Sequence, residues 1–217
     1  INYKKERIFK NFGFQAGLSL LHYSNANVKA PNTSINSLTL NDGITYNFDD
    51  EDPEYQYNLS DDEPYKESIK YNIVFRSGIN ESDVLGSGQF PFYILSAYVD
   101  KRLNRKSAIQ FGVDAFFSNF LKELIYYQSV GFPENDIDAD TDYKRLGVFV
   151  GHELFVNKLS IITQFGFYAY YPYDFEGRIY QRIGFKRYFG DKWFAAVTLK
   201  SHAAKAEAVE LGIGIRL

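Results

Sequence analysis

Ten segments of the sequence alternate apolar and polar residues with a period of two. In the last of them, every second residue from Val209 to Leu217 is aliphatic, and the residues between are charged or glycine. Because residues two apart on a β-strand face the same side, this pattern predicts strands with one apolar and one polar face. The predicted strands are residues 12–25, 37–48, 68–78, 90–103, 108–119, 144–156, 159–171, 178–188, 193–202 and 209–217.

The polar face of these strands carries full charges at mid-strand, as at Asp100, Asp114, Arg182 and Lys200. A soluble barrel would turn such charges to water and fill its centre with the apolar face, whereas a transmembrane barrel does the reverse. The predicted strands are about 9–14 residues long, against a mode of about 5–6 residues in soluble sheets. We therefore expect an all-β fold, an antiparallel transmembrane β-barrel of about ten strands (8–14 possible) that forms one domain over residues 1–217. A soluble β-sandwich or lipocalin-like barrel is the alternative.

The connections between the predicted strands alternate in length. Short connections at residues 104–106, 156–158 and 189–192 alternate with longer ones at 79–88, 120–142, 171–177 and 203–208. Outer-membrane barrels combine short periplasmic turns with long outer loops, so this rhythm predicts a cell outer membrane location in a Gram-negative bacterium. It also places the connection after the first predicted strand on the outer side. The acidic connection 49–66 breaks the rhythm, because a short turn is expected there.

Composition excludes several classes of function. The net charge of −3 offers no general basic field for nucleic acid, and without cysteine no disulfide or thiolate metal site can form. No apolar run approaches the roughly 18 residues that a transmembrane helix needs. Aromatic residues make up 18% of the chain, as suits a barrel whose aromatic side chains gather at the two membrane interfaces.

The end of the first predicted strand carries a candidate catalytic group. His22 and Ser24 share the parity of the apolar residues of this strand, so both continue its apolar face. A serine hydroxyl becomes a useful nucleophile when a neighbouring base takes its proton, and His22 could be that base. Asn25 could donate a hydrogen bond to a developing oxyanion. A polar rim at the membrane interface is the alternative interpretation of this group.

The same residues carry a resemblance to a known family. The chain reads His-Tyr-Ser-Asn-Ala from His22 to Ala26, and Lys29, Pro31 and Asn36 follow before the next strand. This arrangement resembles the outer-membrane lipid A 3-O-deacylase (PagL-type) family and the related acyloxyacyl hydrolases of Bacteroidetes-like bacteria. Later stretches similar to that second group are residues 151–153, 164–166, 180–184, 199–202 and 210–212.

The resemblance implies a membrane-embedded serine esterase that removes the ester-linked acyl chain at position 3 of lipid A. It makes Ser24 the nucleophile, His22 the base and Asn25 part of the oxyanion hole. The acid of the family, fourteen residues after the histidine, is replaced here by Asn36. An amide can orient an imidazole, but it stabilises an imidazolium less than a carboxylate does. Asp42, which shares the apolar parity of its strand, is a weaker candidate for the acid.

Asn36 motivates a second hypothesis, a barrel that binds lipopolysaccharide without catalysis or serves as a structural subunit of a larger outer-membrane assembly. A small pore, supported by the charged polar face, is a third. The expected partners are lipid A or lipopolysaccharide and the outer membrane, with a homo-oligomer or an assembly left open. We expect no cofactor and no metal.

Other polar residues are interpreted as structural. The aspartates of the loop 134–142 are expected to be solvated rather than to bind calcium, since the glycine and distal glutamate of a calcium loop are absent. His202, Glu153 and Glu210 share the polar parity and, with Glu207, are expected to form a paired network inside the barrel. His152 has the apolar parity and no evident partner.

Overall fold

The structure is a computed structural model that describes residues 1–31, 34–48, 65–203 and 205–217. In these residues the chain forms eleven β-strands, one α-helix and one 3-10 helix. The elements are β1 (Asn2–Phe9), β2 (Phe12–Tyr23), β3 (Ile35–Tyr46), β4 (Lys70–Glu81), β5 (Gln89–Arg102), β6 (Ser107–Ser118), α1 (Asn119–Gly131), η1 (Pro133–Asn135), β7 (Arg145–Val156), β8 (Leu159–Tyr170), β9 (Ile179–Phe189), β10 (Trp193–His202) and β11 (Lys205–Arg216).

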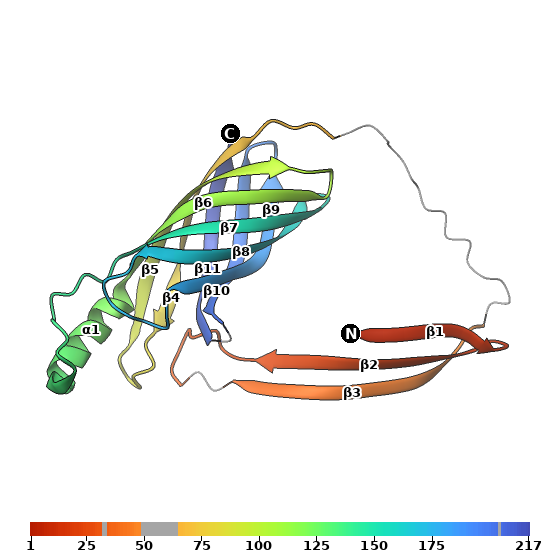
Figure 1. Cartoon of the computed structure of the whole chain (residues 1–217), viewed down its shortest axis with the longest axis horizontal. Helices are drawn as coiled ribbons and strands as arrows, with labels where there is room; N and C mark the ends of the chain where they lie inside the picture. The colour runs from red at the N-terminus through yellow and green to blue at the C-terminus, as the bar shows by residue number, and fades with distance from the viewer. Residues whose placement is uncertain (32–33, 49–64, 204) are drawn as a thin grey trace. The chain divides into compact units, whose positions relative to one another are not determined.

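Strands β4 to β11 form a closed antiparallel barrel, drawn from yellow to blue in Figure 1. Each strand pairs with its neighbours in the sequence, and β11 closes the ring on β4 through pairs from Leu211↔Ser77 to Arg216↔Asn72. Eight strands enclose an interior just wide enough for side chains to fill. Closure leaves no unpaired strand edge in this part of the chain.

The apolar faces of the barrel strands point outward and the charged faces point inward. Val113 and Ile213 are 50% and 57% exposed, whereas Asp114 and Lys200 are each 1% exposed. The predicted orientation of the two faces is therefore confirmed for the barrel, and a barrel with an apolar centre is excluded. The charges inside are compatible with burial only because they are paired.

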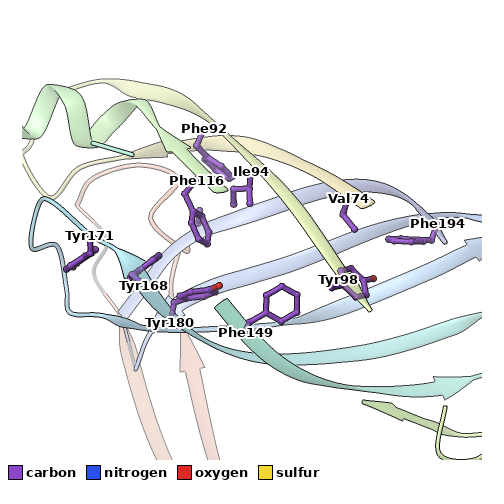
Figure 2. Close-up of a cluster of buried hydrophobic side chains, with 11 residues drawn as sticks. Val74, Phe92, Ile94, Tyr98, Phe116, Phe149, Tyr168, Tyr171, Tyr180 and Phe194 are labelled. Atoms are coloured by element: carbon purple, nitrogen blue, oxygen red, sulfur yellow. The ribbon is translucent and has the colours of Figure 1, made fainter. Parts of the chain in front are cut away.

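Ion pairs and aromatic rings fill the barrel interior. Arg182 donates from Nε to Glu210 at 2.6 Å and from Nη1 to Asp114 at 3.0 Å. The expected network is confirmed, since His202 Nε2 lies 2.6 Å from Glu207 and Lys186 donates to Glu153 at 2.8 Å. Figure 2 shows the buried aromatic rings of the interior, which include Phe92, Phe116, Phe149, Tyr168, Tyr180 and Phe194.

The two ends of the barrel differ as the connection lengths predict. Residues 103–106, 157–158 and 190–192 make the short turns at one end, which we call the short-turn end. The connections 82–88, 119–144 and 171–178 are long and lie at the opposite end, the long-connection end. The prediction of a long connection over 203–208 is wrong, because β11 begins at Lys205. The predicted strand began only at Val209. The β10–β11 ladder has a register shift between Lys200 and Ser201, and the regular alternation of apolar and polar residues is interrupted there.

The helix α1 replaces part of the predicted loop 120–142. It buries Phe120, Leu121, Leu124 and Ile125, whose spacing of three and four residues puts them on one helical face. Within the acidic loop 134–142, the Asp138 carboxylate accepts a hydrogen bond from the Asp140 N–H at 2.9 Å. The acidic connection 49–66 lies outside the described residues except for its last two positions.

Strands β1, β2 and β3 form a separate antiparallel sheet in that order. Residue contacts divide the chain into two compact units, the first made of residues 1–25 and 33–63 and the second of residues 26–32 and 64–217. The predicted antiparallel barrel is therefore confirmed, and its eight strands lie within the expected 8–14. The expectation of about ten is too high, because two of the ten predicted strands join β1 in the separate sheet. Alternation fixes the two faces of a strand but not its neighbours. That residues 1–217 act as one membrane domain stays a prediction.

Candidate active site

An apolar stripe on the β1–β3 sheet ends in a polar pair. On facing positions of β2 and β3, Leu18 is opposite Leu40 and Leu20 is opposite Leu38. The next pair with the same parity is His22 opposite Asn36. Residues directly opposite in an antiparallel ladder project to the same face, so the stripe of leucines leads to the histidine.

His22 and Asn36 are joined by a short hydrogen bond. The distance from His22 Nδ1 to Asn36 Oδ1 is 2.6 Å, and both side chains are exposed. An amide oxygen can only accept, so His22 Nδ1 carries the proton in this arrangement. The other ring nitrogen, Nε2, then has the free lone pair that a general base requires.

Ser24 and Asn25 follow β2 directly and are exposed. Ser24 lies two residues beyond His22, past the end of the strand at Tyr23. The chain turns immediately afterwards, because Ala26 and Asn27 have positive φ angles of 54° and 62°. The structure thus brings His22 and Asn36 together as predicted, and Ser24 and Asn25 lie between the end of β2 and the turn at Ala26 and Asn27.

The segment after this turn is bound to β4 of the barrel unit. The Asn27 side chain donates to the Glu81 carbonyl at 3.0 Å, and the Glu81 N–H donates to the Asn27 carbonyl at 3.1 Å. The Glu81 carboxylate also accepts the Ala30 N–H at 2.9 Å. Glu81 is the last residue of β4, at the long-connection end, so residues 27–30 are fixed to that end of the barrel.

Asp42 is too far along the sheet to replace the missing acid. It lies opposite Ala16 on β2, six residues from His22 along the strand. At a rise of about 3.3 Å per residue the separation is roughly 20 Å. The weaker candidate for the acid is therefore wrong, and Asn36 is the residue that holds the His22 ring.

The structure contains a serine–histidine pair elsewhere that the sequence did not reveal. Ser107 Oγ lies 2.6 Å from His152 Nε2, on β6 and β7 of the barrel. The prediction that His152 has no evident partner is thus wrong. The pair is diagonal in the ladder, since Ser107 is opposite Leu154 and Ile109 is opposite His152. Only the register between β6 and β7, which the sequence does not give, could have revealed it.

The described part of the chain contains no group of three or more histidine, aspartate or glutamate residues that could hold a metal ion. Among the same residues, no helix is long and apolar enough to cross a membrane.

The fold and the site together define a β-barrel protein with a histidine–amide pair at the end of an apolar sheet face. Residues 69–217 match the family described as acyloxyacyl hydrolase, C-terminal domain, and residues 1–45 match the family described as lipid A 3-O-deacylase (PagL). The chain therefore belongs to this acyl hydrolase family. The first match covers the closed barrel and the second covers almost all of the β1–β3 sheet. No curated protein and no solved structure matches the chain.

Proposed function

We propose that this protein is an outer-membrane serine esterase that removes an ester-linked acyl chain from lipid A. The observation that carries the proposal is the His22–Asn36 hydrogen bond of 2.6 Å, which lies within the residues that match the lipid A 3-O-deacylase family. The pair presents a base at the end of an apolar face. That combination suits a substrate whose reactive ester joins a polar sugar to a hydrocarbon chain.

The barrel supports a location in the membrane. Its outward face is mostly apolar, and its backbone groups are paired around a closed ring. Only helices and closed barrels satisfy the backbone inside a bilayer. The short and long connections orient the barrel with the short-turn end toward the periplasm. The segment 27–30, bound to Glu81, then lies at the outer end, three residues beyond Ser24 in the chain.

The proposed reaction begins with Ser24. Its Oγ attacks the ester carbonyl carbon, and its proton passes to His22 Nε2. The Asn25 amide donates to the oxyanion that forms. When the intermediate collapses, the sugar hydroxyl leaves with the proton from Nε2, and an acyl-serine remains. Water, deprotonated by the same nitrogen, then releases the fatty acid and restores the serine.

Asn36 has a positioning role in this scheme. Its side-chain oxygen holds the Nδ1 proton and so fixes the tautomer in which Nε2 can accept. The leucine pairs Leu18–Leu40 and Leu20–Leu38 offer an apolar surface along which an acyl chain can lie next to the histidine.

Mass spectrometry of lipid A incubated with the purified protein tests the proposal. We expect the loss of one acyl chain with the unaltered protein, and intact lipid A with Ser24→Ala and His22→Ala. Ser19→Ala, on the other face of β2, is the matched control and should keep full activity. Intact lipid A in every sample would contradict the proposed esterase activity. If lipid A nevertheless stayed bound to the protein, the result would support the second hypothesis, a barrel that binds lipopolysaccharide without catalysis.

A further inference from the structure

Three exposed basic residues belong to neighbouring parts of the barrel at its short-turn end. Arg187 is on β9, Lys158 is in the β7–β8 turn and Lys192 is in the β9–β10 turn, and all three are exposed. Because β8, β9 and β10 are neighbours in the barrel, these two turns lie next to each other along its rim. The Lys158 carbonyl accepts the Tyr188 N–H at 3.0 Å, which keeps the first turn against the strand that carries Arg187.

Arg187 lies on the outward, mostly apolar face of β9. Ile183, Phe185 and Phe189 share its parity on β9, and each of them is exposed. Across the ladder, Arg187 is opposite Leu159 on β8 and the small Ala195 on β10. A guanidinium on a hydrocarbon-facing wall is costly unless it reaches the headgroup layer, which its long side chain allows.

These cations have no counter-ion within the described residues. Neither Arg187 nor Lys158 nor Lys192 forms an ion pair there, although Asp191 lies in the same turn as Lys192. The nearby carboxylates of Glu67 and Asp100 are bound by Arg216 instead, at 2.8 and 2.7 Å. The cluster therefore keeps a positive charge that an external anion can neutralise.

An aromatic pair marks the depth of this cluster. Trp193 on β10 is opposite Phe189 on β9, and both rings are about half exposed. This pair lies two residues nearer the β9–β10 turn than Arg187 does. Aromatic residues gather where hydrocarbon meets headgroups, so the cations lie at the level of lipid phosphates.

We propose that Lys158, Arg187 and Lys192 form a binding site for the phosphate of an anionic phospholipid in the leaflet at the short-turn end. The three cations hold the phosphate, and the wall formed by Phe185, Phe189 and Trp193 contacts the acyl chains. This inference depends on the proposed membrane location but not on the esterase activity.

Trp193 is the only tryptophan of the chain, so it reports lipid binding at this site directly. The protein is placed in phosphatidylcholine bilayers that contain either brominated phosphatidylglycerol or brominated phosphatidylcholine at the same mole fraction. Bromine quenches the tryptophan only at close range. We expect an apparent preference for phosphatidylglycerol of at least about fivefold, the factor that one basic residue near an anionic surface supplies. The preference should fall as sodium chloride is raised.

The variant Lys158→Gln/Arg187→Gln/Lys192→Gln should lose the preference while still showing quenching by both lipids. Lys122→Gln/Lys144→Gln, which removes two exposed lysines near the long-connection end, is the matched control and should keep it. Inorganic phosphate, compared with chloride at equal ionic strength, should not reduce the preference. A reduction would indicate a site for free anions and overturn the lipid site.

Other outcomes also decide the matter. Equal quenching by the two lipids, or a preference that survives in the triple variant, would overturn the proposed site. If neither lipid quenched Trp193, the membrane location would fail as well. The lipid A assay on the triple variant separates the two proposals, since we expect normal acyl release without lipid preference.

Discussion

The Nδ1 atom of His22 lies 2.6 Å from Oδ1 of Asn36, on a sheet whose other same-face pairs on these two strands are mostly apolar. This contact fixes the tautomer of the imidazole without supplying a negative charge. The role of Asn36 can therefore be measured separately from that of the histidine.

Asn36→Asp should increase kcat for lipid A deacylation by about tenfold. A carboxylate accepts the same Nδ1 proton, and its charge-assisted hydrogen bond is roughly twice as strong once the imidazole becomes protonated. Asn36→Leu, which cannot accept the proton, should decrease kcat by about 10²-fold. Steady-state release of fatty acid gives both values. An unchanged kcat in both variants would mean that Asn36 does not position His22.

Removing one interior charge should strongly destabilise the barrel. Glu210→Gln leaves Arg182 and Arg76, both fully buried, with less neutralising charge, and we expect a loss of about 3–5 kcal/mol in the free energy of unfolding. Lys144→Gln breaks the exposed ion pair with Asp142 and should change the free energy of unfolding by less than about 1 kcal/mol. Urea unfolding in lipid vesicles, followed by Trp193 fluorescence, compares the two. Similar losses in the two variants would show that the interior ion pairs contribute no more to stability than the exposed pair does.

The barrel should not conduct ions. Arg182 on β9 pairs across the interior with Asp114 on β6 and Glu210 on β11, and the rings of Phe116, Tyr168 and Tyr180 pack against one another inside the barrel (Figure 2). An eight-stranded ring leaves little space beyond these side chains. We expect planar bilayers to stay at baseline current after insertion of the protein. Stable conductance steps would support the small pore considered from the sequence.

Stability should depend on pH through Glu67, which precedes β4. Burial alone would raise the pKa of its carboxyl, but the hydrogen bond from Arg216 at 2.8 Å and the charge of that residue outweigh burial and hold the pKa below its ordinary value of 4.5. A lowered pKa in the folded state stabilises the protein above pH 4.5, and this stabilisation is lost as the pH falls through the folded-state pKa.

Glu67→Gln should therefore flatten the change in unfolding free energy between about pH 5 and pH 3. Urea midpoints of the two proteins at several pH values in this range provide the comparison. Parallel pH profiles would contradict the role given to Glu67.

Much of the barrel could be predicted because alternation is a local property. Eight of the predicted strands became β4 to β11, and residues such as Val113 and Asp114 face the expected sides. The family resemblance put Asn36 in the place of the acid that should face His22, and the pairing of β2 with β3 makes the two residues direct neighbours.

The remaining features depend on long-range pairing or on weak local signals. Strand β1 carries four consecutive charged residues from Lys4 to Arg7 and shows no alternation, so only its pairing with β2 identifies it as a strand. The apolar residues of α1 occupy barely two helical turns. Closure of the ring between β11 and β4 joins residues more than 130 positions apart, for which a local pattern contains no information.

The ion pairs inside the barrel have a consequence for its assembly. Glu210, which helps to neutralise Arg182 and Arg76, lies on β11, the strand whose pairing with β4 closes the ring. A nascent ring that lacked this strand would present unneutralised guanidinium groups to lipid. Electrostatics would thus oppose membrane insertion of a barrel in which β11 has not yet paired with β4, so that ring closure and insertion favour each other.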